Sequence, residues 1–378
     1  MPRDIIHASV YGTGLGHAAR VSLIAEKLMK EFDVYFTSWD DGARYLGKRG
    51  FRVFDVRSVD IEWNEQGRIS FKGTVKRLPY FYSDFAFQIM QERNIMEKLK
   101  PKLVISDSRL SAIIAAKIMN VKTMLITNQL RISLPQIDSI MMRFLERVNA
   151  EFLFTFWDQS NMLLVPDLPP PYTISEGVVD TLALSRRRLI YVGFVQENKP
   201  CTLTNSNRKK VSILVSGPPA SRSSLIPMVR AAGKKLAAKY EVVLSEGNAA
   251  GPSLATFDSG MKVYSWCPDP WSEIASSDVV VARAGHSTIS QIILAGKRAI
   301  LIPIPFHGEQ WANAKKSSKL GFARVLDQLN TTPSQLVREI EYVMHDDSML
   351  KCVEKVRDVS LRYNGIDNIV KLVKKAMD

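Results

Sequence analysis

The alternation of short apolar, β-rich runs with helical patterns constrains the fold of this chain more than any other feature. The runs are residues 5–10, 34–37, 51–56, 103–106, 122–127, 162–165 and 189–192, and then 211–215, 241–244, 261–264, 279–282, 299–302 and 323–326. Between several of them, apolar residues recur at the spacing of a helix, as in residues 21–28. A continuous apolar run such as 279–281 is typical of a parallel strand that is buried on both faces. The pattern predicts an α/β fold with parallel sheets.

A polar segment divides this pattern into two halves of similar size. We expect an N-terminal domain of residues 1–196, a linker of residues 197–210 and a C-terminal domain of residues 211–378, whose last helix can pack back on the N-terminal domain. Ligands of such domains bind at the carboxyl ends of the strands, and here also in the cleft between the domains.

Composition and cysteine spacing exclude several classes of protein. Hydrophobic residues make up 46% and charged residues 24% of the 378-residue chain, which excludes disorder and low complexity. Cys201, Cys267 and Cys352 lie far apart without a CxxC pair, so we expect neither a disulfide framework nor structural zinc. The chain turns polar and glycine-rich too early for a signal peptide, and its apolar runs fall short of the about 18 residues of a membrane span. We therefore expect a cytoplasmic protein.

The chain is strongly basic. Lys and Arg number 51 against 38 Asp and Glu, a formal net charge of +13, and residues 68–150 alone hold 14 basic and 6 acidic residues. Such an excess attracts phosphorylated substrates, nucleic acid or anionic lipid headgroups. The alternative, a solvated basic surface that aids solubility, stays open.

A glycine loop with a histidine follows the first predicted strand. In Gly12-Thr13-Gly14-Leu15-Gly16-His17 the glycines allow a ligand to approach the backbone, and the following helix N-terminus favours negative charge. His17 stands where a dinucleotide fingerprint has glycine, and the absence of a Walker lysine excludes a P-loop. Histidine accepts a proton near neutral pH, which suits a general base, but a structural role for His17 stays open.

Asp107 follows the predicted strand 103–106. Because parallel strands end at one edge of a sheet, Asp107 can reach His17, fix its tautomer and stabilise its protonated form. The alternative is that Asp107 or Ser108 caps the next helix.

Loops of the second half suit an anionic ligand. Ser216 and Gly217 allow backbone approach to a phosphate, although Pro218 and Pro219 each lack an N–H donor. In the segment 282–290, glycine, hydroxyl groups and a helix N-terminus together suit a diphosphate without a metal. The alternative is a helix capped by a hydroxyl of that segment.

Two polar residues after the run 299–302 suit a sugar. Glu309 and Gln310 supply an acceptor and an amide for sugar hydroxyls. Each could also be an exposed polar residue at a helix start.

These motifs resemble those of GT-B glycosyltransferases, and most closely those of the MurG-type family, which adds N-acetylglucosamine to lipid-linked acceptors. The segment ARAGHSTISQIILAGKRAILIPIPFHGEQWANA, within residues 263–325, resembles the family's donor-binding signature, and GTGLGH resembles its glycine loop. The resemblance implies two Rossmann-like domains whose parallel sheets face a central cleft.

The resemblance also implies roles for individual residues. His17 would deprotonate the acceptor, oriented by Asp107, with inversion at the anomeric carbon. The diphosphate of the donor would lie at residues 285–288, and its base near the backbone of Trp266. The implied substrate-binding residues are Gly14, Gly16, Ser216, Gly217, Trp266, Arg283, Gly285, His286, Ser287, Thr288, Gln291, Glu309 and Gln310. A UDP-sugar donor carrying N-acetylglucosamine or another hexose follows from the same resemblance, with no metal or other cofactor.

Two positions depart from the family pattern. Gln291 stands where the family has a glutamate that binds ribose hydroxyls, and a neutral amide binds them less strongly. Pro218-Pro219 stands where glycine-rich sequence is common. Both departures concern the identity of the donor rather than the fold.

The acceptor side has its own candidate surface in residues 61–100. Basic residues there, Lys72, Lys76 and Arg77, alternate with aromatic residues, which suits a peripheral contact with an anionic membrane near a lipid-linked acceptor. Further along, Phe81, Phe85 and Ile89 fit the core face of a helix, which leaves the preceding loop and the basic residues for the membrane. Nucleic acid is not an expected partner.

Two other functions compete with glycosyl transfer. One is a nucleotide-sugar epimerase or hydrolase of the same fold, which acts without an acceptor. The other is a noncatalytic polyanion-binding protein, which would not need both the glycine–histidine loop and the donor signature.

Overall fold

The first half of the chain forms a seven-stranded parallel sheet. The computed structural model describes residues 3–59, 71–131, 140–179, 189–197, 208–248, 251 and 254–378. The strand order is β3-β2-β1-β4-β5-β6-β7. The strands are β1 (Ile5–Val10), β2 (Asp33–Ser38), β3 (Arg52–Asp55), β4 (Leu103–Asp107), β5 (Lys122–Ile126), β6 (Met162–Val165) and β7 (Leu189–Tyr191). The helices described in this half are α1 (Gly16–Leu28), α2 (Asp40–Lys48), α3 (Phe71–Leu99), α4 (Leu110–Ile118), α5 (Ile140–Trp157) and α6 (Glu176–Val179).

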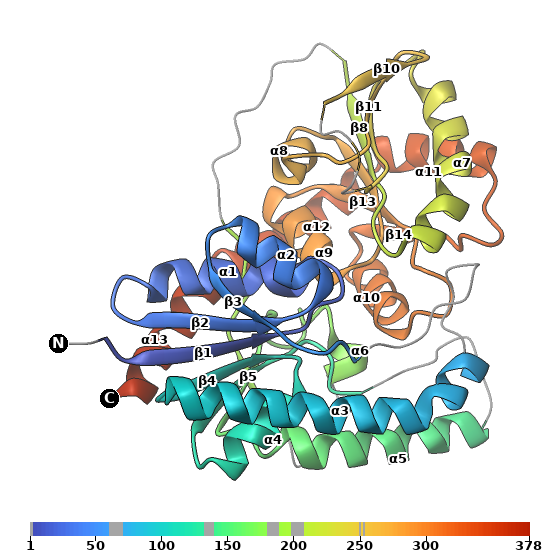
Figure 1. Cartoon of the computed structure of the whole chain (residues 1–378). Coiled ribbons are helices and arrows are strands. Elements are labelled where there is room, and N and C mark those ends of the chain that lie inside the picture. The colour runs from blue at the N-terminus through green and yellow to red at the C-terminus, as the bar shows by residue number, and fades with distance from the viewer. Residues whose placement is uncertain are drawn as a thin grey trace.

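The second half repeats this arrangement (Figure 1). Its sheet has the order β10-β11-β9-β8-β12-β13-β14, in which β10 alone among the described strands is antiparallel to its neighbour. The strands are β8 (Lys210–Leu214), β9 (Glu241–Ser245), β10 (Thr256–Asp258), β11 (Met261–Tyr264), β12 (Val279–Ala282), β13 (Arg298–Leu301) and β14 (Ala323–Val325). The helices are α7 (Pro219–Leu236), α8 (Pro270–Ala275), α9 (His286–Ala295), α10 (Gly308–Lys319), α11 (Pro333–Met344), α12 (Asp347–Ser360) and α13 (Gly365–Met377).

Burial explains why the two sheets form. All four residues of β12 are buried, as the continuous apolar run predicts for a central parallel strand. The α/β prediction with two Rossmann-like units is confirmed. In both sheets the strand order reverses beside the first strand, between β1 and β4 and between β8 and β12. Ligands of open α/β sheets bind at such points.

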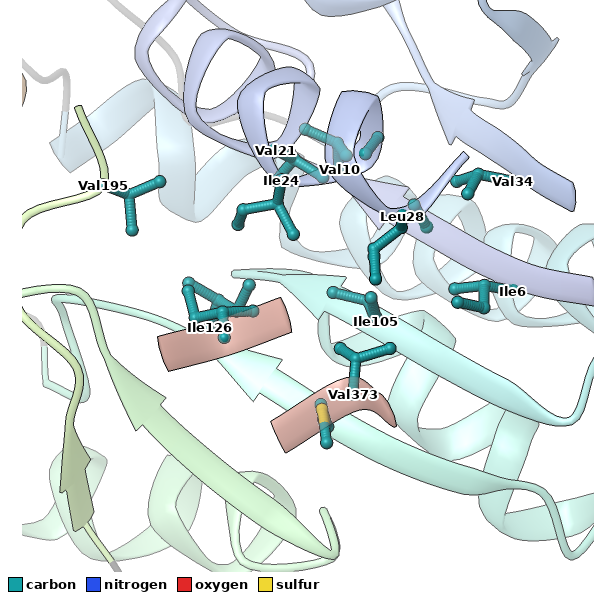
Figure 2. Packing of buried hydrophobic residues seen from close by; sticks show 14 of the residues in the cluster. Ile6, Val10, Val21, Ile24, Leu28, Val34, Ile105, Ile126, Val195 and Val373 are labelled. Carbon is teal, nitrogen blue, oxygen red and sulfur yellow. The ribbon is translucent and has the colours of Figure 1, made fainter. Parts of the chain in front are cut away.

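The last helix packs against the first sheet. Ile366, Ile369 and Val373 of α13 are buried in the same apolar cluster as residues of β1, α1 and β4. Figure 2 shows Val373 among these side chains, near Ile105. Burying each of the three large side chains contributes about 1.5–3 kcal/mol. Lys27 and Asp367 add an ion pair at 2.5 Å between α1 and α13.

Helices α6 and α10 join the two halves near the middle of the molecule. A Cβ atom on Gly177 of α6 would lie 3.0 Å from the Cβ of Ala312 in α10, so the two helices approach closely there. Lys316 of α10 is almost fully buried, and its Nζ lies 2.6 Å from a carboxylate oxygen of Glu176. The predicted linker 197–210 lies mostly outside the described residues.

Among the described residues, none of the helices has both the length and the apolar character needed to cross a membrane.

Candidate active site

The glycine loop, residues 12–16, contacts Trp39 closely before α1 begins. A Cβ atom on Gly12 would lie 2.3 Å from the carbonyl oxygen of Trp39, so only glycine fits there. Gly14 has a φ of +77°, which is the left-handed region that glycine adopts at no cost. The helix begins at Gly16, and this places His17 in its first turn. The ring of His17 packs edge-on against Tyr11, with 5.4 Å between the ring centroids.

The structure brings His17 and Asp107 together. Asp107 ends β4 and pairs in register with Val10, the last residue of β1. Its carboxylate oxygen Oδ1 lies 2.7 Å from Nδ1 of His17. Asp107 is fully buried, whereas 27% of the His17 side chain is exposed. Since an ionised carboxylate only accepts, Nδ1 carries the hydrogen, and Nε2 is the nitrogen that can take a proton from a substrate.

The capping alternative for this segment does not apply. The N-cap of α4 is Arg109, which makes no side-chain capping bond, and Asp107 belongs to the strand.

Arg20 also holds Asp107, beside His17, and its Nη2 lies 3.1 Å from Nδ1 of His17. Its Nε donates to Oδ2 of Asp107 at 2.5 Å, and its Nη2 donates to Oδ1. Burial by itself would raise the pKa of Asp107, but the charges of Arg20 and then of His17 outweigh it and hold that pKa below its usual value. Arg20 was not predicted from the sequence, although its position three residues after His17 places both on one face of α1.

Helix α9 of the second half faces the glycine loop. A Cβ atom on Gly16 would lie 3.3 Å from the hydroxyl oxygen of Ser287, so the N-termini of α1 and α9 meet across the two halves. Gly285 is the N-cap of α9, and a Cβ atom there would have no neighbour within 4 Å. Neither Ser287 nor Thr288 caps the helix, contrary to the capping alternative. No side chain caps this N-terminus, and the space beside Gly285 is open, so the first backbone N–H groups of the helix can bind an anion there.

The side chain of His286 contacts the first half of the molecule. Its Nε2 lies 3.1 Å from Oδ2 of Asp167, which follows β6. Asp167 also accepts hydrogen bonds from the backbone N–H and the hydroxyl of Ser175, at 2.8 and 2.7 Å. Burial would raise the pKa of Asp167, but His286 and Ser175 lower it. The side chain of His286 is therefore engaged with the first half, and only its backbone is left for a ligand. Asp167 was not predicted from the sequence, because its partner lies in the other half of the chain.

Arg283 is buried and joins the segments that follow β12 and β13 to the start of α7. Its guanidinium donates to the carbonyl oxygens of Ile302 and Ser221, at 3.0 and 2.8 Å, and to the side chain of Gln328 at 2.7 Å. Burial lowers the pKa of Arg283 to about 10. These contacts join the ends of β12 and β13 to the start of α7, so Arg283 shapes the site through the backbone.

The start of α10 presents Glu309 and Gln310. Oε1 of Gln310 accepts from the backbone N–H of Ile304 at 3.0 Å, which directs the amide nitrogen as the group that can donate to a ligand. His307 caps the helix through Nδ1, 3.4 Å from the N–H of Gln310, and burial lowers the pKa of His307, which favours the neutral ring that this cap needs. Oε1 of Glu309 accepts from Asn128 of the first half at 2.8 Å.

The remaining candidates lie elsewhere in the second half. Ser216 and Gly217 are exposed between β8 and α7, and Gly217 has a φ of +108°. Trp266 follows β11 and is half-buried. The amide of Gln291 lies 3.4 Å from Gln196, at the end of the first half.

The acceptor-side surface is described only in part. Tyr80, Tyr82 and Phe87 of α3 are exposed by 70%, 64% and 45%. Ile89 packs into the core against α4, as predicted, and Phe85 is half-buried. Residues 61–70 and the side chains of Lys72, Lys76, Arg77 and Phe81 lie outside the described residues.

A buried charged cluster that the sequence did not predict lies between α3 and the first sheet. Glu92 of α3 is fully buried, and its carboxylate lies 2.7 Å from Nη1 of Arg109 and 3.1 Å from Nε2 of His7. The hydroxyls of Ser9 and Thr37 donate to it at 3.0 and 2.8 Å. Burial would raise the pKa of Glu92, but Arg109 and then His7 hold it at about 2. Arg109 also stacks on Trp39, at 5.0 Å from the ring centroid, which links this cluster to the glycine loop.

Comparisons with known proteins agree with this fold. Residues 213–363 match the glycosyltransferase family 28 C-terminal domain, and residues 4–152 match glycosyl transferase family 1. An uncharacterized glycosyltransferase of Methanosarcina acetivorans is 23% identical, with 97% of each chain covered. A UDP-N-acetylglucosamine--N-acetylmuramyl-(pentapeptide) pyrophosphoryl-undecaprenol N-acetylglucosamine transferase of a Thermoanaerobacter species is 28% identical over 36% of each chain. The crystal structure of MurG from Acinetobacter baumannii superposes with a TM-score of 0.64 at 16% identity, covering 99% of this chain and 100% of that one.

Proposed function

We propose that this chain, a glycosyltransferase with a GT-B fold that resembles the MurG type, transfers a hexose from a nucleotide-sugar to an acceptor hydroxyl with His17 as the general base. One observation carries the proposal. His17, oriented by the buried Asp107, lies at the N-terminus of α1, which meets the open N-terminus of α9 across the two halves. A base and an anion site thus face each other, as transfer from a diphosphate donor requires.

The donor in this proposal binds to the second half. Its diphosphate lies on the backbone N–H groups that follow Gly285, where the helix dipole stabilises negative charge without a metal. Glu309 and Gln310 bind hydroxyls of the sugar, and Gln291 and the backbone near Trp266 bind the nucleoside. The proposed nucleotide of the donor is UDP, because the Thermoanaerobacter relative is named for a UDP-N-acetylglucosamine donor.

The proposed reaction is a single displacement. The acceptor oxygen attacks the anomeric carbon while Nε2 of His17 takes its proton, and the bond between that carbon and the diphosphate oxygen breaks. Attack from the face opposite the leaving group inverts the anomeric configuration. Asp107 stabilises the imidazolium that forms, and the N-terminus of α9 stabilises the charge that develops on the departing nucleoside diphosphate.

The proposed acceptor is lipid-linked and reached from an anionic membrane surface on the cytoplasmic side. Exposed apolar side chains on α3 and α5 support this proposal, and they are Tyr80, Tyr82, Phe87, Met90, Phe144 and Val148. The basic excess of residues 68–150 would add attraction to anionic headgroups. If the protein does not bind anionic liposomes at low salt, the proposed membrane contact is wrong.

The first experiment is thermal unfolding with UDP, GDP and dTDP at equal concentration. A ligand at a hundredfold excess over its Kd adds about 2.7 kcal/mol of stability, which shifts the transition by several degrees. A shift with UDP and not with the others identifies the donor class, and a shift with another nucleotide alone overturns the UDP assignment.

The second experiment tests the base. His17→Ala and Asp107→Asn should each lower the turnover of transfer by about 10²–10⁴-fold while the UDP shift persists. His345→Ala removes an exposed histidine at the end of α11 and is the matched control. Wild-type turnover in His17→Ala, or an equal loss of UDP affinity, would contradict the role of His17. Sugar release without any acceptor at the rate of transfer would favour a hydrolase instead.

A further inference from the structure

Asn128 forms a hydrogen-bonded bridge between the two halves of the molecule. It follows β5 and is buried. Its Oδ1 accepts from Nη1 of Arg20 at 2.9 Å, and its Nδ2 donates to Oε1 of Glu309 at 2.8 Å. A guanidinium only donates and a carboxylate only accepts, so both partners require the same orientation of the amide.

This bridge extends the contacts of the proposed base. Arg20 donates to both oxygens of Asp107, and Asp107 accepts from His17. A continuous chain of hydrogen bonds therefore runs from His17 in α1, through three buried side chains, to Glu309 in the first turn of α10. One end is the proposed base for the acceptor, and the other is the proposed ligand of the donor sugar.

We propose that Asn128 and Arg20 are positioning residues, which couple the closure of the two halves to the orientation of His17. The inference rests on the proposed function. When α10 lies against the first half, Glu309 holds the amide of Asn128, and Asn128 in turn holds Arg20 on Asp107. Without the contact between Asn128 and Glu309, Arg20 loses this support, and Asp107 and His17 are less firmly oriented.

The bridge also orients Glu309. Because Nδ2 of Asn128 occupies Oε1, the other carboxylate oxygen is the one presented to a ligand, and it accepts from a hydroxyl. A residue of the acceptor-side half thereby shapes the recognition of the donor sugar. Other contacts also hold the halves together, among them Asp167 with His286 and Glu176 with Lys316, so loss of the bridge alone leaves the fold intact.

The discriminating variant is Asn128→Asp. It keeps an oxygen for Arg20 but places a carboxylate against Glu309, where the two like charges repel. Adding Glu309→Gln reverses the bond, because the new amide of residue 309 can donate to the aspartate. Asn120→Asp is the matched control, since this exposed turn residue gains the same charge in the same half.

The four combinations of these two substitutions form a double-mutant cycle with two readouts. In sugar transfer, Asn128→Asp should lower kcat/KM by roughly 10- to 100-fold, and the double variant should regain most of that loss relative to Glu309→Gln alone. UDP binding, which involves no sugar, should change less than twofold. In urea unfolding, the double variant should recover the midpoint that Asn128→Asp loses.

Each other outcome overturns part of the inference. Wild-type kcat/KM in Asn128→Asp, or additive losses in the double variant, would remove Asn128 from the positioning of the site. Coupling in unfolding without coupling in transfer would make the bridge structural only. If His17→Ala retains turnover, the proposed function fails, and the unfolding cycle still tests the bridge by itself.

Discussion

Glu92→Gln tests the buried cluster that supports the glycine loop. The substitution keeps the shape of the side chain but removes the charge that faces Arg109 and His7. It leaves the guanidinium of Arg109 buried without a carboxylate, and burial already lowers the pKa of Arg109. An uncompensated buried charge of this kind is strongly destabilising.

The size of the effect follows from the pKa of Glu92. The folded protein lowers it from an ordinary 4.5 to about 2, with burial opposing and Arg109 and His7 prevailing. A drop of that size corresponds to about 3 kcal/mol of folding free energy at neutral pH. Because the folded pKa is the lower one, this contribution is present above about pH 4.5 and is lost as the pH falls toward 2.

Urea unfolding of the wild-type protein and of Glu92→Gln, at pH 7 and at pH 3, measures this contribution. The variant should be less stable by about 3 kcal/mol at pH 7, and by about half of that at pH 3. Glu97→Gln, on the exposed face of the same helix and paired with Arg93, should cost less than about 0.5 kcal/mol. A loss below about 1 kcal/mol at pH 7, or a loss that does not shrink at pH 3, would refute the reasoning.

Two further predictions concern the backbone around the site. Asp167→Asn removes the charge that faces His286, so α9 should be held less firmly against the first half. The affinity for UDP should therefore fall roughly 10-fold. An unchanged affinity in a UDP titration would contradict this prediction. Gly12→Ala forces a Cβ atom against Trp39 and should lower the free energy of unfolding in urea by roughly 1–3 kcal/mol. Gly47→Ala adds a Cβ atom in open space within α2 and should be neutral or stabilising. Equal effects of the two substitutions would contradict the packing argument.

The fold was largely predictable because continuous apolar strands such as β12 carry a strong local signal. Strand β10 was missed, since it has only three residues, of which Thr256 and Phe257 are exposed at the sheet edge. Its pairing with β11 depends on the tertiary structure rather than on its own pattern.

The candidate active site was likewise predictable only in part. The approach of Asp107 to His17 was predictable, because parallel strands end at one edge of the sheet. Arg20, Asn128 and Asp167 were missed, since polar residues in a sequence resemble solvated surface until their distant partners are known. The N-cap of α9, which is Gly285 rather than a hydroxyl residue, could not be predicted either, because glycine, serine and threonine are all favoured at N-caps.

The return of α13 to the first sheet has a consequence for synthesis in the cell. Ile366 and its neighbours fill the same core as β1, yet about 170 residues of the second half are made between the end of the first sheet and α13. At about 5–20 residues per second, the ribosome needs roughly 10–30 s for that stretch. During this time the apolar side chains of the first half that pack against α13 are not yet covered by it. A chaperone can therefore bind them before the last helix emerges.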